Sequence, residues 1–182
     1  MKKFIFIMCY VFLVSCGKPQ ISESIRDPNF DFVSFAKNLA ENNPDAANPS
    51  QAVGYIKIRS EFNKKILLEC SNMFGVRAPA YKNSYHQWSE RERAILEKVE
   101  LYWSRGAGKE HDSAQVIELL KNKIFNEILK QANKYSNEHS VSLEYSLLNY
   151  CDNHFIGLDN GSYRRRAPKA YEYLEASLNL ND

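Results

Sequence analysis

Residues 48–75 read NPSQAVGYIKIRSEFNKKILLECSNMFG, and this segment alone predicts a long helix. The Asn48 side chain can accept a hydrogen bond from a free backbone N–H at the helix start, and Pro49 suits the first helical position. Arg59 interrupts the apolar side, and we expect its long side chain to reach solvent from the edge. Gly75 supplies a stop. The apolar residues at helical spacing, which we expect in the core, are Ala52, Tyr55, Phe62, Ile66, Cys70 and Met73.

The same spacing predicts helices on both sides of this segment. A short helix is expected at residues 29–42, before the Asn-Pro pairs that end at Pro44 and Pro49. A long aromatic-rich helix is expected from Pro79 to Gly106, and its apolar stripe holds Tyr81, Tyr85, Trp88, Ile95, Val99 and Tyr102. These aromatic residues, with Trp103, are interpreted as core, the alternative being exposed binding anchors.

Three more helices are predicted towards the carboxyl end. One begins at Asp112 or Ser113 and ends near Asn137, with the most regular 3.6-residue period in the chain. The next is capped by Ser140 or Ser142 and ends at the turn signal Asp159-Asn160-Gly161. The last carries Tyr171, Leu174 and Leu178.

These patterns predict an all-α protein. Long alternating β patterns are absent from the sequence, and it holds only 7 glycines. No internal repeat is evident, which disfavours a helical-repeat solenoid. We therefore expect residues 29–182 to form a single compact bundle of about five or six helices with one disulfide.

The amino-terminal residues have the pattern of an export signal. Lys2 and Lys3 precede an apolar run at residues 4–14, which is too short to span a bilayer core of about 30 Å. The run ends in Leu13-Val14-Ser15-Cys16, which resembles the lipobox of bacterial lipoproteins. The resemblance implies a signal peptide at residues 1–15, lipidation of Cys16, and a flexible tether over residues 16–28. The alternatives are a buried core helix or a plain transmembrane anchor.

Gly17 bears on the destination of such a lipoprotein. Many Gram-negative lipoproteins that stay in the inner membrane carry Asp directly after the lipidated cysteine, and Gly17 instead resembles the outer-membrane class. The resemblance implies a lipid-anchored protein on the outer membrane that faces the periplasm. Its membrane contact would be the N-terminal lipid.

The charge balance disfavours nucleic acid as a partner. The chain has 24 Lys and Arg residues and 22 Asp and Glu residues. Cleavage before Cys16 would remove Lys2 and Lys3 and no acid, which leaves 22 basic residues against 22 acidic ones. A mature domain without net charge has no overall field to gather nucleic acid.

Two of the four cysteines are expected to pair. Cys9 lies in the leader and Cys16 would carry lipid, so Cys70 and Cys151 remain. An oxidising periplasm favours a disulfide between them, and closing such a loop stabilises a fold by about 4 kcal/mol. The alternative is two separately buried thiols. No C-x-x-C or H-E-x-x-H spacing supports zinc, and no cofactor is expected.

No catalytic motif is found in the sequence. His86, His111, His139 and His154 lie in different segments, and none forms an i, i+4 pair with another. Glu110-His111-Asp112 and Asp152-Asn153-His154 cannot orient one another as the members of a catalytic triad do, because adjacent side chains point in different directions. They are therefore interpreted as helix-end residues. G-x-S-x-G and the phosphate-loop pattern are both missing. We therefore expect no enzyme, although carboxylates that converge in space leave a cell-wall-acting hydrolase as an alternative.

The densest basic patch is the candidate protein-binding surface. It consists of Tyr163, Arg164, Arg165 and Arg166, with Lys169 one turn further on. Arg and aromatic side chains are enriched in protein contacts, and Arg binds carboxylates with two parallel hydrogen bonds. The alternative interpretation is a solvated loop before the last helix.

Together these features predict a protein that binds another periplasmic or envelope protein. In class it looks like two kinds of small helical lipoprotein: immunity proteins that neutralise effectors of rival bacteria, and pilotins that escort secretin subunits. Immunity ranks first because it needs only a surface complementary to an effector. A pilotin-like accessory would need a groove for an amphipathic segment. The oligomeric state and the contacting face stay open.

Overall fold

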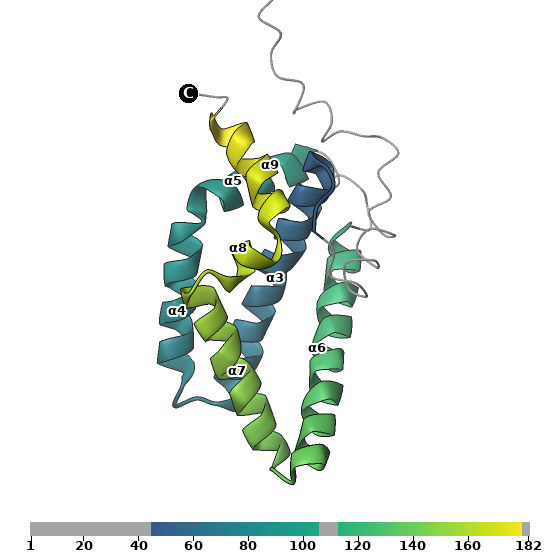
Figure 1. Cartoon of the computed structure of the whole chain (residues 1–182), viewed down its shortest axis with the longest axis vertical. Coiled ribbons are helices and arrows are strands. Elements are labelled where there is room, and N and C mark those ends of the chain that lie inside the picture. Colours follow the sequence, from purple (N-terminus) through teal and green to yellow (C-terminus); the bar gives the residue numbers. More distant parts are fainter. Residues whose placement is uncertain (1–44, 106–112, 180–182) are drawn as a thin grey trace, which may run out of the picture.

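The computed structural model describes residues 45–105 and 113–179, and these residues form an all-α fold without strands. The expected helix at residues 29–42, the expected leader and tether, Cys16, and Glu110-His111-Asp112 lie outside the described residues. No helix in the described part is both long and apolar enough to cross a membrane. The described helices are α3 (Pro49–Met73), α4 (Ala78–Arg91), α5 (Arg93–Arg105), α6 (Ser113–His139), α7 (Leu143–Asp159), α8 (Ser162–Arg166) and α9 (Pro168–Asn179) (Figure 1).

Helix α3 is the central element of the bundle. It begins as predicted, because the Asn48 side chain accepts a 2.9 Å hydrogen bond from the Gln51 N–H and Pro49 is the first helical residue. It ends at Met73, two residues before Gly75, and the expectation that Met73 lies in the core was wrong, because this residue is 39% exposed at the helix end. Every residue from Ser50 to Ile58 except Gln51 is buried, because α3 contacts α4, α5, α6, α7 and α9. Such all-round burial is typical of a core helix.

The predicted aromatic-rich helix is two helices. The prediction of one uninterrupted helix was wrong, because α4 ends at Arg91 and α5 begins at Arg93. Glu92, between them, has φ −97° and ψ 7° and is only 2% exposed. The break lets the two halves of the stripe reach different parts of the core. Tyr81 and Trp88 pack with Phe62 and Phe155, while Ile95, Val99 and Trp103 pack with Tyr55 and Leu174.

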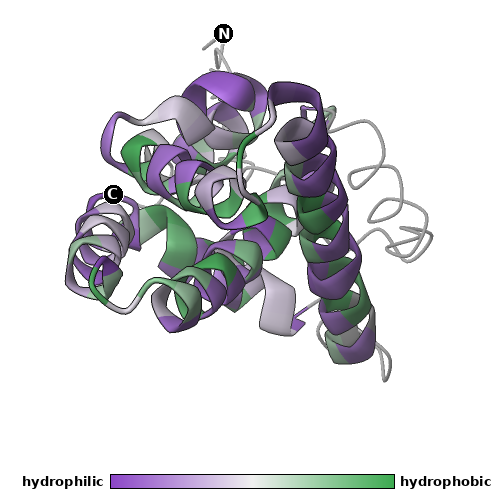
Figure 2. Ribbon diagram, turned by 90° about the horizontal axis from the view of Figure 1, so that it is seen from below, coloured by the Kyte–Doolittle hydropathy of each residue, from purple (hydrophilic) through white to green (hydrophobic). Residues whose placement is uncertain are grey.

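Helices α6 and α7 form an antiparallel pair joined at one end of the molecule (Figure 1). The start of α6 agrees with the prediction, and its end at His139 lies two residues beyond Asn137. Ser140 has a positive φ of 54°, which turns the chain, and Ser142 caps α7 by accepting a 3.0 Å hydrogen bond from the Tyr145 N–H. Each helix carries hydrophilic and hydrophobic stretches, as expected of amphipathic helices packed in one bundle (Figure 2).

The predicted disulfide is confirmed. Cys70 of α3 and Cys151 of α7 are joined, with their Cα atoms 5.9 Å apart. Both residues are buried, at 0% and 1% exposure, among the residues around Phe62 and Phe155. Tyr81, Trp88 and Trp103 are buried as the core interpretation requires, and Tyr85 and Tyr102 are partly buried against the core. The bridge therefore ties the central helix to α7 inside the core.

Candidate functional site

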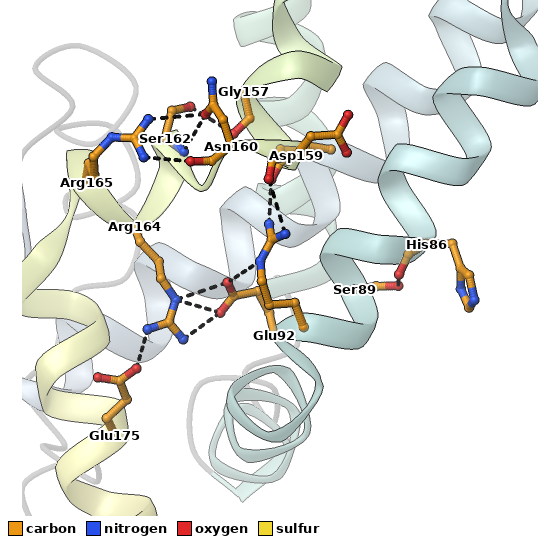
Figure 3. A network of polar contacts seen from close by, with 12 residues as sticks. His86, Ser89, Glu92, Gly157, Asp159, Asn160, Ser162, Arg164, Arg165 and Glu175 are labelled. Carbon is orange, nitrogen blue, oxygen red and sulfur yellow. Dashed lines mark hydrogen bonds and ion pairs between the residues drawn. The ribbon is translucent and has the colours of Figure 1, made fainter.

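The turn after α7 positions the predicted basic patch. Gly161 has φ 69°, a left-handed conformation that glycine adopts without steric cost, and α8 begins directly after it. The Ser162 N–H donates to Asn160 Oδ1 at 3.0 Å, and Ser162 Oγ donates to the Gly157 carbonyl at 3.0 Å. A Cβ at Gly157 would lie 2.9 Å from Ser162 Oγ, so a larger residue there would displace the Ser162 side chain from this position. The chain thus turns tightly onto α7 and presents residues 163–166 on a short helix (Figure 3).

Arg164 belongs to an internal ion network. Its Nε and Nη2 donate to the buried Glu92 carboxylate at 2.9–3.1 Å, and its Nη1 donates to Glu175 (Figure 3). The guanidinium carbon also lies 4.6 Å from the centroid of the Tyr171 ring. The hydrogen bond with Glu92 raises the pKa of Arg164 above its usual range, so the group stays charged. Arg164 therefore connects α8 to the α4–α5 break and to α9.

The other members of the patch have different surroundings. Arg165 is exposed and donates to the Asn160 carbonyl and side chain, at 2.6 and 3.2 Å. Lys169 has an exposed side chain on α9, and its backbone N–H donates to Asp45. Tyr163 is 8% exposed, and its hydroxyl lies 2.9 Å from His154 Nδ1. The structure therefore does not present the five residues as one uniform surface, and protein binding by this set stays a prediction.

Arg166 lines a small pocket between α3, α7 and α8. The volume of this pocket is about 170 Å³, and Arg59 of α3 contributes a second guanidinium. None of the described residues that line it is acidic. Its walls are Arg59, Phe62, Tyr150, Asn153, His154, Gly157, Ser162, Tyr163 and Arg166. We call this site the Arg59–Arg166 pocket.

The two arginines give the pocket a positive potential. Burial lowers the pKa of His154 to about 3, and the charges of Arg59 and Arg166 add to this shift. Burial raises the pKa of Tyr163 to about 12, with the same two cations opposing the rise. Burial likewise raises the pKa of Tyr150, again against Arg59 and Arg166. The charges of both guanidinium groups therefore act on Tyr150, His154 and Tyr163.

No protein-family model, curated protein or solved structure matches this chain. In the described part, no group of three or more His, Cys, Asp or Glu residues is placed to hold a metal ion.

Arg59 was not recognised as a site residue from the sequence. It interrupts the apolar face of α3 as expected, but it is half-buried and its guanidinium carbon lies 5.3 Å from the centroid of the Tyr55 ring. Its Nε is buried and has no hydrogen-bond partner among the described residues. Tyr150 and Gly157 were missed as well, although with Asn153 their i, i+3, i+7 spacing on α7 places them on one side of that helix. The interpretation of Asp152-Asn153-His154 as helix-end residues was wrong, because all three lie inside α7, where Asn153 and His154 line the pocket.

A second pocket, of about 510 Å³, lies between α3, α4 and α5. Three glutamates line it, and it is the place where the hydrolase alternative would find its acids. Two of them already have cationic partners, because Glu90 pairs with Arg93 and Glu100 accepts a 2.6 Å bond from Lys57. The acids of this pocket are thus partly neutralised, whereas the Arg59–Arg166 pocket has no acid in its walls.

The low pKa of His154 predicts loss of stability in acid. The unfolded chain should bind a proton at His154 near pH 6.5, while the folded protein should not bind it until about pH 3. The free energy of unfolding should therefore be unaffected above pH 7 and fall by up to about 1.4 kcal/mol per pH unit below pH 6.5. NMR titration of the His154 ring in the folded protein checks the cause, and urea unfolding at pH 7.0 and 5.5 checks the effect.

The control for this prediction is His154→Gln, which keeps a polar group beside Tyr163 and removes the titration. Its stability should depend less steeply on pH over this interval than that of the wild type. A His154 ring that becomes protonated above pH 6 in the folded protein would contradict the prediction.

Proposed function

We propose that this protein is an outer-membrane lipoprotein that faces the periplasm and binds another protein of the cell envelope. In this proposal it acts as an immunity-type inhibitor of an effector that attacks the envelope. Two lines of support come from the described domain: a disulfide suited to an oxidising compartment, and a recessed cationic site on an otherwise charge-balanced chain.

The disulfide supports export. Disulfides persist in the periplasm and are rare in the cytosol, where thiols are kept reduced. Cys70 and Cys151 are bonded deep in the core, and they are the two cysteines that remain if Cys9 is cleaved off and Cys16 is acylated. The pairing therefore agrees with an N-terminal export signal, which was inferred from different residues.

The Arg59–Arg166 pocket is the observation that carries the binding role. Two guanidinium groups with no ion-pair partner among the described residues flank a space of about 170 Å³. Guanidinium groups bind carboxylates in a bidentate manner, and complementary charge increases both association rate and specificity. A partner with an exposed acidic side chain fits this site.

The shape of the pocket favours an inhibitor over a secretion escort. A pilotin-like role needs an apolar groove that accepts one face of an amphipathic segment. The Arg59–Arg166 pocket is small and has polar walls that include Asn153 and Ser162, so it suits a single charged side chain. Its walls also come from helices held by a disulfide and an ion network, and a preorganised surface loses little entropy on binding.

A competition experiment in cells tests the proposal. Deletion of the gene should make cells sensitive to neighbouring bacteria that deliver the effector, and a wild-type copy should restore survival. A Cys16→Ala copy should incorporate no palmitate, resist cleavage before residue 16 and fail to protect, because the domain is no longer anchored. Affinity purification of the lipidated protein from envelopes should recover the effector.

Unchanged survival of the deletion strain, with no effector recovered, would show that the immunity role is wrong. Recovery of a secretin subunit would favour the pilotin alternative. Palmitate labelling that persists in the Cys16→Ala variant would contradict the lipid anchor.

A further inference from the structure

We infer that the Arg59–Arg166 pocket is a carboxylate-binding site, filled in the complex by an aspartate or glutamate side chain of the partner. This inference rests on the proposed function for the source of the carboxylate. The binding chemistry itself depends only on residues of this chain, so the two can fail separately.

The first support is that the pocket is lined by two cations and by no acidic side chain. In the described part of the chain, Arg164 pairs with Glu92 and Glu175, and Arg91 lies 3.6 Å from Glu92. Arg59 and Arg166 have no such carboxylate among the described residues, yet both line the same pocket. A cleft lined by one sign of charge concentrates ions of the opposite sign.

The second support is an unsatisfied donor. The Arg59 Nε is buried and makes no hydrogen bond within the described residues. Buried donors are rarely left without an acceptor, and each exception calls for an explanation such as a bound ion. A carboxylate in the pocket would bring an acceptor to the Arg59 guanidinium, whose Nε has none in the described part of the chain.

The third support is the set of neutral polar groups around the two cations. Asn153 and Ser162 line the pocket, and burial and both arginines lower the pKa of His154 to about 3, which keeps it neutral. The buried aromatic residues Phe62 and Tyr163 form the apolar walls. Charged hydrogen bonds are stronger in such a partly desolvated site than in water. The volume of about 170 Å³ suits one acidic side chain rather than a large ligand.

The experiment uses the purified mature protein and four probes: blocked glutamate (N-acetyl-glutamate amide), blocked glutamine as its neutral counterpart, succinate, and inorganic phosphate. Binding is followed by NMR, from the Nε–H signals of Arg59 and Arg166 and the backbone amide of Ser162. Blocked glutamate should bind saturably in roughly the millimolar range, as expected for so small a ligand. It should shift the Arg59 Nε–H signal, and blocked glutamine should not bind.

The matched variants are Arg166→Gln and Arg165→Gln. They remove the same charge from adjacent exposed residues, but only Arg166 lines the pocket, because Arg165 bonds to Asn160. Arg166→Gln should weaken the binding of blocked glutamate by at least about tenfold, the loss expected for one hydrogen bond to a charged group. Arg165→Gln should change it less than about twofold. Arg59→Lys keeps the charge of this half-buried residue and should also weaken binding, since lysine lacks the planar fork.

Several outcomes would overturn the inference. Equal losses of affinity for blocked glutamate in Arg166→Gln and Arg165→Gln would mean that the general positive potential of the surface, rather than a defined site, attracts the ligand. Binding of succinate or phosphate without blocked glutamate would mean that the pocket takes a free small anion. No saturable binding of any probe, in a protein whose deletion still sensitises cells, would reject the pocket and leave the proposed function standing. Saturable glutamate binding without a survival phenotype would support the pocket and reject the immunity role.

Discussion

Replacing both Cys70 and Cys151 with alanine should lower the free energy of unfolding by about 4 kcal/mol. The bond closes a loop with a sequence separation of 81 residues, and in the chain-entropy model its loss allows the unfolded chain many more conformations. Both sulfur atoms lie in the core, so the substitution also removes packed atoms around Phe155. Urea unfolding of the oxidised wild type and the double variant at pH 7 measures the difference.

Alanine is preferred to serine here, because a serine hydroxyl at a site of 0–1% exposure would add a separate desolvation cost. The reduced wild type provides the control, since it lacks the bond but keeps both side chains, and it should lose most of the same free energy. A loss below about 1 kcal/mol in both proteins would mean that the unfolded state is already compact or that the bond contributes little.

Glu92→Gln should be the most damaging change of a single charge, with a cost of about 2–3 kcal/mol. Glu92 is 2% exposed and accepts bonds from both Nε and Nη2 of Arg164. Removing one partner of a buried ion pair leaves the other charge uncompensated, which costs about 3–5 kcal/mol when both partners are buried. The Arg164 side chain is 39% exposed, so water recovers part of that cost. Thermal and urea unfolding measure the loss.

Glu175→Gln is the matched control for Glu92→Gln. It removes the other carboxylate that binds Arg164, but the Glu175 side chain is 44% exposed. Exposed ion pairs contribute about 0–1 kcal/mol, so this variant should be much milder than Glu92→Gln. Equal effects of the two variants would show that the burial of Glu92 does not determine its contribution.

The Glu92 network and the pocket are linked through α8. Arg164 holds this short helix against the α4–α5 break, and Arg166, two residues further on, then lies at the pocket. A helix of five residues has little stability by itself and depends on such tertiary contacts. The ion network thus supports the position of a functional candidate that it does not touch.

The helix ends were predictable because capping residues act locally, and the disulfide was predictable because the chain has few cysteines. Asn48 and Ser142 cap their helices as their residue types indicate, and Gly161 takes the left-handed turn after α7. Cys70 and Cys151 were the only pair left once Cys9 was assigned to an expected leader and Cys16 to an expected lipidation site.

The break at Glu92 could not be predicted from periodicity. The apolar spacing continues from Trp88 to Ile95, so a single helix satisfies the pattern as well as two do. The chain turns because Trp88 and Ile95 pack in different parts of the core and because Arg164 pairs with the buried Glu92 carboxylate. Both causes depend on residues from distant helices.

The sequence by itself determined that the protein is helical, where most of its helices begin and end, and which cysteines pair. Only the tertiary structure decided the surroundings of each arginine: Arg164 bonds to Glu92, Arg165 bonds to Asn160, and Arg166 lines the same pocket as Arg59 of α3. Neighbouring residues on a helix point about 100° apart, so one basic run is divided among three environments. Helix signals act within one turn of the chain, whereas a binding pocket requires side chains that only the packing of helices brings together.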